Sequence, residues 1–398
     1  MHSIVILGGN FGGVSTAHYI LRHVLPSLNS TTGEFKVTLI SPSDRTFYKI
    51  GAPRVMASAE LPVAKPLASI QDAFKHYKAS EFSFYQGEAV RVDETNKTVY
   101  IKSAGTNEET AFQYDSLVVA TGMTTPSPLW SQHGDHKLTI AAFEDMRKRL
   151  PKAKSILIAG GGPTGIETAG EIAYSYRSTD ITLLSGGTRL LPRLNHVSVG
   201  KAAEKQLTSL RVKTIHQVKV TSISELEDGR TSVNLSDGST KTVDIYINAT
   251  SGTPNTNFLP AGWLDVAKRV VTDGSTLRAT KAPAGIYAIG DAASYSNGGL
   301  MDATFPVPAL GYSIWSDLRA AAKNGDPKKA PVGSAELKEK VYKAMESDMQ
   351  IVPIGPKGGV GIMFGIKLAS FFVWLLKSRT FFLEKAPGLA TGADFLKP

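Results

Sequence analysis

The chain has 398 residues, enough for two or three domains, and its 42% hydrophobic and 20% charged residues exclude a disordered, collagenous or polytopic membrane protein. The absence of cysteine excludes a redox-active dithiol, Cys-ligated zinc and iron–sulfur clusters, and we expect no metal site. A formal net charge of +9 fits anionic surfaces, nucleotides or nucleic acid, and equally a role in solubility alone.

The first predicted element is a short apolar strand at residues 4–7 (IVIL). Neither a basic segment nor a long apolar segment precedes it, so we expect a cytoplasmic protein without a secretory signal. Residue 2 is His rather than Gly, which excludes N-myristoylation.

A glycine-rich turn follows this strand and opens a helix that extends to about residue 23. In dinucleotide-binding folds the first glycine of such a turn bends the chain, the middle one admits the pyrophosphate and the last lets helix and strand pack. Asn10 takes the middle place, and because Asn tolerates unusual backbone angles we expect the turn to form. Alone, this incomplete motif is a weak indication of a dinucleotide site. Its residues are Gly8, Gly9, Asn10, Phe11, Gly12 and Gly13.

The next segments complete a first α/β unit. Residues 36–40 predict a second strand that ends at Ser41, and the alternating residues 81–100 and 111–115 predict a small antiparallel sheet. A further strand at residues 116–120 runs into Thr121 and Gly122, where a glycine would let the backbone approach a flat ring.

A second unit repeats this order about 150 residues later. A strand at 155–159 leads into a complete G-x-G-x-x-G turn and a helix, whose N-terminal N–H groups and dipole would hold phosphates. A strand at 180–184, hairpins over 213–235 and a strand at 244–249 running into residues 250–252 follow, which indicates a duplicated dinucleotide-binding domain. The motif glycines are Gly160, Gly162 and Gly165.

The position that contacts the ribose lies about 20 residues after such a turn and is often acidic. Here Ser41 and Ser185 occupy the two corresponding strand ends. A carboxylate in the second unit would repel a 2′-phosphate, whereas Ser185 followed by Arg189 is compatible with one. The alternative is that Arg189 is a solvated surface residue.

Near residue 290 a further strand, at 286–289, leads into Gly290 and Asp291, and a helix is predicted over 308–322. Asp291 fits a ribityl hydroxyl, or else it caps an ordinary helix. The two glycine turns and the two Thr-(Ser)-Gly strand ends together favour the flavin role.

The last prominent segment is the apolar run 360–376, which contains Lys367. It is too short and too charged for a spanning helix of roughly 20 apolar residues. As a helix it would place Lys367, Ser370, Trp374 and Lys377 on one stripe, with apolar residues elsewhere. Such a helix fits peripheral membrane contact through residues 360–379, a dimer seam, or packing on the flavin domain, so monomer and homodimer both stay open.

Taken together, the motifs resemble the two-dinucleotide flavoprotein oxidoreductases of the glutathione-reductase structural class. Within it, the chain most resembles the ferroptosis-suppressor-like branch of apoptosis-inducing-factor homologues, and it is similar to type II NADH:quinone dehydrogenases. The resemblance rests on GGNFGG (8–13), YDSLVVATG (114–122), GGGPTGIETAGE (160–171), ATSGTPNT (249–256), GIYAIGDAA (285–293) and KSRTFF (377–382).

The resemblance implies an α/β fold with two Rossmann-like, three-layer domains, the NAD(P) domain inserted in the FAD domain, and a C-terminal α+β segment. It implies FAD as cofactor and NADH or NADPH as co-substrate. The expected boundaries are 1–128 and 256–322 for the FAD domain, 129–255 for the NAD(P)H domain and 323–398 for the C-terminal domain.

The family's FAD contacts would fall on the first glycine turn, Arg54 in the APR segment, Ala89, Thr121, Gly122 and Asp291, with altered ribose contacts at Ser41. Glu167 resembles a glutamate near nicotinamide and flavin, and Lys377 and Phe382 match positions near flavin and quinone. The alternative is a purely structural role, in which Glu167 is an acid in the first turn of a helix and is stabilised by the helix dipole.

The implied reaction passes a hydride from NAD(P)H to FAD and then electrons to a quinone without a dithiol relay, since the chain has no cysteine. Two alternatives stay open. One is an enzyme of the same fold that acts on a specialised aromatic metabolite. The other is a flavin-bound signalling or nucleic-acid-binding protein, although no nucleic-acid motif is present.

Overall fold

The computed structural model describes residues 1–28, 34–106, 108–325 and 337–398, which form an α/β protein around two parallel sheets. The larger sheet is parallel from β18 to β5 and continues as an antiparallel extension, as predicted for residues 81–115. Its order is β18 (Ile286–Ala288), β8 (Ser116–Val119), β1 (His2–Leu7), β2 (Phe35–Ser41), β5 (Phe82–Asp93), β6 (Thr98–Ser103) and β7 (Glu109–Gln113).

Helices and loops cover both faces of this sheet, so its central strands are apolar on both sides. Ile4, Val5 and Ile6 of β1 are fully buried. On one face lie α1 (Phe11–Tyr19), which continues through a π-helical turn at Ile20–Val24, and α9 (Val307–Gly325), the helix predicted over 308–322. The other face packs against the loop region around Trp263 and Val270.

The second sheet has the order β12 (Val212–His216), β11 (Asp180–Ser185), β10 (Ser155–Ala159) and β16 (Ile245–Asn248), all parallel. One face carries α5 (His136–Arg149), α6 (Pro163–Ser175) and α7 (Val197–Ser209). The other carries an antiparallel sheet of β13 (Val220–Glu225), β14 (Thr231–Leu235) and β15 (Thr240–Val243).

The prediction of hairpins from residue 213 was therefore wrong at its start. Val212 is buried and pairs with Ile181, so the segment 212–216 is a fourth parallel strand. The hairpins begin only at Val220. Short apolar runs do not distinguish a parallel strand from a hairpin strand, because the difference lies in the distant partner.

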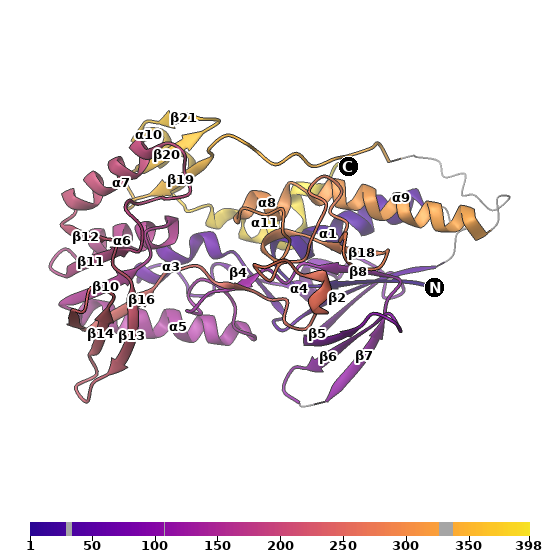
Figure 1. Ribbon diagram of the computed structural model, residues 1–398, viewed down its shortest axis with the longest axis horizontal. Helices are drawn as coiled ribbons and strands as arrows, with labels where there is room; N and C mark the ends of the chain where they lie inside the picture. Colours follow the sequence, from indigo (N-terminus) through magenta and orange to yellow (C-terminus); the bar gives the residue numbers. More distant parts are fainter. Residues whose placement is uncertain (29–33, 107, 326–336) are drawn as a thin grey trace.

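The chain crosses between the two sheets twice, and the crossings pair with each other. β9 (Met123–Thr124) and β17 (Thr253–Pro254) are antiparallel. Asn255 joins them: its Nδ2 donates to the Thr121 carbonyl, and its Oδ1 accepts from the Thr124 hydroxyl. Figure 1 shows the two sheets side by side along the long axis of the molecule.

The C-terminal segment runs back over the second sheet and then returns to the first (Figure 1). β19 (Gln350–Pro353), β20 (Gly359–Met363) and β21 (Ile366–Leu368) form an antiparallel sheet against α6 and α7. α10 (Ser370–Val373) and a π-helical turn at Trp374–Ser378 lead to the junction of the two sheets, and α11 (Ala386–Thr391) packs on α1.

The single helix considered for the apolar run 360–376 was wrong. Phe364 and Gly365 adopt φ angles of +51° and +76°, which turn the chain between β20 and β21, and β-branched Val360 and Ile362 favour strand. The helix starts only at Ser370. Among the described residues no helix is both long and apolar enough to cross a membrane.

The remaining elements are short. They are α2 (Leu25–Ser27), β3 (Arg45–Phe47), α3 (Ala52–Ala57), β4 (Leu67–Ser69), α4 (Ile70–Phe74), α8 (Leu300–Thr304) and 3-10 turns at Lys49–Gly51, Leu150–Lys152, Ala261–Trp263, Gly290–Ala292, Leu383–Lys385 and Ala393–Phe395.

Candidate functional site

The two glycine turns have the same backbone geometry at the carboxyl edges of the two sheets. Gly8 and Gly160 have φ angles of +120° and +134°, and a Cβ on either would lie 2.2 or 2.4 Å from a carbonyl oxygen next to the adjacent strand. A Cβ on Gly13 or Gly165 would lie 1.8 or 1.9 Å from the carbonyl of the first glycine. Both pairs are therefore required for strand and helix to pack, which leaves the N-termini of α1 and α6 at the sheet edges.

Asn10 supports the first turn in a way that the sequence did not predict. Its φ of −126° and ψ of −158° are ordinary extended angles, so tolerance of unusual angles is not the reason for Asn. Its side chain donates from Nδ2 to the Phe47 carbonyl at 3.0 Å and accepts at Oδ1 from the Phe47 N–H at 3.2 Å. In the second turn Gly162 faces open space, with no atom within 4 Å of an added Cβ.

The neighbours of Asn10 in the first turn pack against other segments. The Phe11 ring lies 5.6 Å from the Tyr48 ring, and a Cβ on Gly12 would lie 3.1 Å from the Ile289 side chain. The turn is thus held between the loop that follows β3 and the end of β18.

Ser41 and Ser185 are small residues beneath the turns. They are only 4% and 1% exposed, and a Cβ on Gly9 or Gly161 would lie 2.6 Å from the corresponding serine Oγ. The Ser185 hydroxyl also donates to the carbonyls of Gly187 and Arg189. The two serines are where the sequence predicted them, but each packs under its turn.

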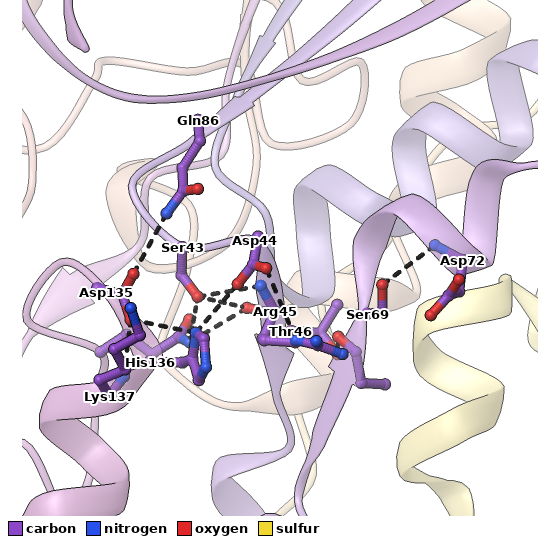
Figure 2. A network of polar contacts seen from close by, with 12 residues as sticks. Ser43, Asp44, Arg45, Thr46, Ser69, Asp72, Gln86, Asp135, His136 and Lys137 are labelled. Carbon is purple, nitrogen blue, oxygen red and sulfur yellow. Dashed lines mark hydrogen bonds and ion pairs between the residues drawn. The ribbon is translucent and has the colours of Figure 1, made fainter. Parts of the chain in front are cut away.

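An acidic residue does lie near the first of these strand ends. Figure 2 shows Asp44 and Asp135 converging on His136, with Ser43 and Gln86 beside them. The His136 Nδ1 lies 3.0 Å from Asp44 Oδ1 and 3.2 Å from Asp135 Oδ1. Asp135 also caps α5, so this cluster ties the start of α5 to the loop after β2. Sequence reasoning missed Asp44 and His136; the available signal was an acid three residues past Ser41.

The residues expected around the flavin fit a polar, hydroxyl-bearing ligand. Gly122 and Gly290 have φ angles of +64° and +73°, and nothing lies within 4 Å of a Cβ on Gly122. Asp291 Oδ1 is buried and has no hydrogen-bond partner among the described residues, while its Oδ2 lies 3.6 Å from Lys49 Nζ. An unpartnered buried carboxylate oxygen is suited to accept from a ribityl hydroxyl. The residue before the 3-10 turn here is Ile289, so Asp291 does not cap it.

Ala89, which the resemblance also places among the FAD contacts, lies in β5 of the larger sheet. It pairs with Ile101 in the antiparallel part of β5 and β6 and packs against the core on that face.

Two buried carboxylates project from successive turns of α6, each paired with a cation from another part of the chain. Glu167 Oε1 accepts from Lys377 Nζ at 2.6 Å, and Lys377 also donates to the Ile351 carbonyl. Glu171 accepts two hydrogen bonds from Arg54 of α3, one of them 3.0 Å from Nη2. Helix α6 thus joins α3, which comes from the chain between β3 and β4, to the C-terminal segment.

Burial decides the charge behaviour of these carboxylates. Glu167 is 5% exposed, and burial raises its pKa; Lys377 opposes this rise, and the nearby charge of Glu171 adds to it. Burial also raises the pKa of Glu171 against the influence of Arg54. Glu167 lies beyond the first turn of α6, so the alternative of a first-turn acid held by the helix dipole does not apply.

Phe382 and Lys377 have different recorded neighbours. Phe381 is the ring beside the ion pairs, with the Arg54 guanidinium 4.7 Å from its centroid. Phe382 packs instead with Phe11 and other residues next to the first glycine turn. Both phenylalanines have φ angles near +55°, at +53° and +56°, a strained conformation for non-glycine residues that recurs at functional sites.

Arg189 is held by its own loop. Its Nη2 donates to the carbonyls of Pro192 and Leu194 at 3.0 and 2.7 Å. The structure therefore brings together Glu167, Lys377 and Arg54, and it places Asp291 and the first glycine turn at the other sheet. Arg189 Nη2 is bonded within its own loop, whereas its Nη1 is buried and has no hydrogen-bond partner among the described residues.

Comparison with known proteins identifies the family. Residues 2–322 match the model of the pyridine nucleotide-disulphide oxidoreductases. The chain is 33% identical to "Oxidoreductase phnG" of Penicillium herquei, over 99% of this chain and 97% of that protein, and 26% identical to "Ferroptosis suppressor protein 1" of Xenopus tropicalis, over 96% and 94%.

Among solved structures, NDH2 from Plasmodium falciparum superposes with a TM-score of 0.64 over 100% of this chain and 98% of that chain, at 16% identity. At that identity the likeness concerns the fold, and it confirms the predicted arrangement of two Rossmann-like sheets. The chain belongs to the pyridine nucleotide-disulphide oxidoreductase family.

Proposed function

We propose that this protein is an FAD-dependent NAD(P)H oxidoreductase that passes electrons directly to a quinone-type acceptor. The observation that carries the proposal is the buried Glu167–Lys377 pair, which joins α6 to the C-terminal segment. Because the chain has no cysteine, a dithiol relay is not available, and the acceptor must meet the flavin itself.

FAD, when bound, accepts a hydride from the nicotinamide and passes the electrons on. The first glycine turn and Asp291 would hold it, and the N-terminus of α6 would hold the coenzyme pyrophosphate. Reducing a quinone to a quinol also requires two protons. Lys377 Nζ donates a hydrogen bond to Glu167 Oε1, and burial, which raises the pKa of Glu167, makes this carboxylate easier to protonate, so the pair can pass protons beside the acceptor.

The test is an anaerobic titration of the flavin-loaded protein with NADH or NADPH, followed by one addition of a short-chain quinone. Flavin absorbance should fall and then recover promptly. We expect Lys377→Met and Glu167→Gln to slow the recovery by about 10²-fold or more, the range of a lost proton donor. Arg230→Gln, in the exposed Asp228–Arg230 pair, is the control. Full recovery rates in both variants, with normal flavin content, would remove the pair from the mechanism.

A specialised aromatic acceptor is the second candidate. The chain is more similar to the fungal oxidoreductase phnG than to ferroptosis suppressor protein 1, at 33% against 26% identity. Turnover across many short-chain quinones supports the first candidate, and turnover restricted to one substituted ring supports the second.

We further propose that the protein contacts anionic lipid surfaces through the 364–376 surface. This surface lies on the β20–β21 hairpin, α10 and the π-helical turn after it, which adjoin in the fold. The exposed cations Lys367 and Arg379 lie in or just beyond it, a combination suited to a headgroup layer. Its exposed apolar side chains are Phe364, Ile366, Phe371, Phe372, Leu375 and Leu376.

Co-sedimentation with phosphatidylserine-containing vesicles tests this contact. Phe371 and Phe372 are 60% and 51% exposed, and inserting each would contribute roughly 1–2 kcal/mol. The double variant Phe371→Ser/Phe372→Ser should therefore lose more than tenfold in binding. Val266→Ser alters a fully exposed side chain elsewhere and is the control. Equal binding of the double variant and the wild type contradicts the proposal.

A further inference from the structure

A cavity of about 440 Å³ lies at the carboxyl edge of the second sheet, between that sheet and β13. Its lining includes Gly160, the first glycine of the turn that precedes the N-terminus of α6. In dinucleotide-binding folds the adenosine half of the ligand extends from this turn past the end of the second strand. The apolar walls, including Leu184, Val218 and Tyr246, suit a flat adenine ring.

The charge of the cavity wall is unusual for a site that takes an unphosphorylated ribose. Its lining residues include no Asp or Glu, and Lys219 is the cation among them. A carboxylate at the end of the second strand binds the ribose hydroxyls and repels a 2′-phosphate. That place belongs to Ser185, which is buried with its hydroxyl donated to backbone carbonyls, so nothing there repels a phosphate.

Lys219 is positioned at this strand end by its neighbours. A Cβ added to Gly186 would lie 3.1 Å from the Lys219 Cγ and 3.2 Å from its Cε, so the lysine stem runs along the residue that follows Ser185. Its backbone N–H donates to the Ser236 hydroxyl at 3.0 Å, which fixes the start of the side chain.

The ammonium group of Lys219 is available to a ligand. The side chain is exposed and makes no ion pair with any residue in the described part of the chain. Arg189 is not among the residues that line the cavity, and its Nη2 donates to two carbonyls of its own loop. The cation that faces the cavity is therefore the lysine, 34 residues past Ser185 in the sequence.

We propose that Lys219 binds the 2′-phosphate of NADPH and makes this site selective for the phosphorylated coenzyme over NADH. The inference rests on the proposed use of NAD(P)H and adds the residue and the ligand group that determine the preference. Gly186 contributes to this phosphate site, because its lack of a side chain leaves room for the Lys219 side chain.

Calorimetric titration of the flavin-loaded protein with 2′-phospho-ADP-ribose and with ADP-ribose measures this preference without any redox step. The wild type should bind the phosphorylated ligand at least tenfold more tightly, the loss expected for one charge-assisted hydrogen bond. Lys219→Gln should remove the preference and leave ADP-ribose affinity unchanged, and Lys219→Glu should reverse it. The preference should also weaken as salt concentration rises.

The possible results distinguish a failure of the proposed function from a failure of the Lys219 assignment. If neither ligand binds, the proposed function itself fails. If both bind equally to the wild type, or if Lys219→Gln keeps the preference, the coenzyme site stands and the role of Lys219 is wrong. Arg189→Gln is the matched control: loss of the preference in that variant instead would return the role to Arg189.

Discussion

Removing the cation from the buried pair should destabilise the protein in a pH-dependent way. Lys377→Met leaves the Glu167 carboxylate on α6 without its partner, 2.6 Å away in the native protein. Breaking a buried ion pair from one side costs about 3–5 kcal/mol, because an uncompensated charge stays inside the protein. The carboxylate avoids that cost only by taking up a proton.

The pH dependence follows from the direction of the Glu167 pKa shift. Burial already raises this pKa above the ordinary value, and Lys377 is the group that lowers it, so the substitution raises it further. Between the unfolded and folded pKa values the folded protein then holds more protons than the unfolded chain, and stability falls as pH rises. The variant should thus lose about 3 kcal/mol or more at pH 8 and distinctly less at pH 5.

Urea unfolding of the flavin-loaded protein at pH 5 and pH 8 measures both effects. The double variant Glu167→Gln/Lys377→Met should recover most of the loss, since it leaves no buried charge, and the coupling between the two changes should be large. The reasoning is refuted if Lys377→Met costs less than about 1 kcal/mol at pH 8, or if the double variant is less stable than either single one.

Three further predictions concern other sites. Burial lowers the pKa of His18 to about 3, so below pH 7 the unfolded chain binds a proton that the folded protein does not. The free energy of unfolding should therefore fall by about 2 kcal/mol between pH 7 and pH 5. Denaturant titrations of His18→Gln should show a weaker dependence of stability on pH. Gly165→Ala places a Cβ 1.9 Å from the Gly160 carbonyl oxygen and should prevent folding. The Cβ of Gly162→Ala meets nothing within 4 Å, so this variant should keep its melting temperature and lose coenzyme affinity. Equal effects of the two variants would contradict the assigned geometry. Asp291→Ala removes the unpartnered buried oxygen and should weaken FAD retention by about 5- to 100-fold on gel filtration, so full flavin occupancy would place the ribityl chain elsewhere.

The parallel strands and glycine turns could be predicted from the sequence because their signals are local. Apolar runs end in glycine in both units, and the close contacts at Gly8 and Gly160 require that residue wherever the turn is built. The same reasoning located Ser41 and Ser185 but not their packing role, which depends on the loop that lies above each strand end.

Other features depend on contacts between distant segments, which residue spacing does not show. Glu167 and Lys377 are 210 residues apart, and only the family resemblance placed both near one site. Lys219 faces its cavity because of strand order in the second sheet, and no spacing rule marks it. The run 360–376 was misinterpreted because hydrophobicity was given more weight than Gly365, which lies in the turn between β20 and β21.

The route of the C-terminal segment has a consequence for the newly made chain. Glu167 is synthesised long before Lys377. The C-terminal segment then binds α1 and the π-helical turn after it, where His18, Arg22 and His23 contact carbonyls of residues 390–395. A chain interrupted after the second sheet would have both glycine turns and no partner for Glu167. Such a fragment would also lack β18 and Asp291, so neither the Glu167–Lys377 pair nor the proposed FAD site could be complete before the rest of the chain is made.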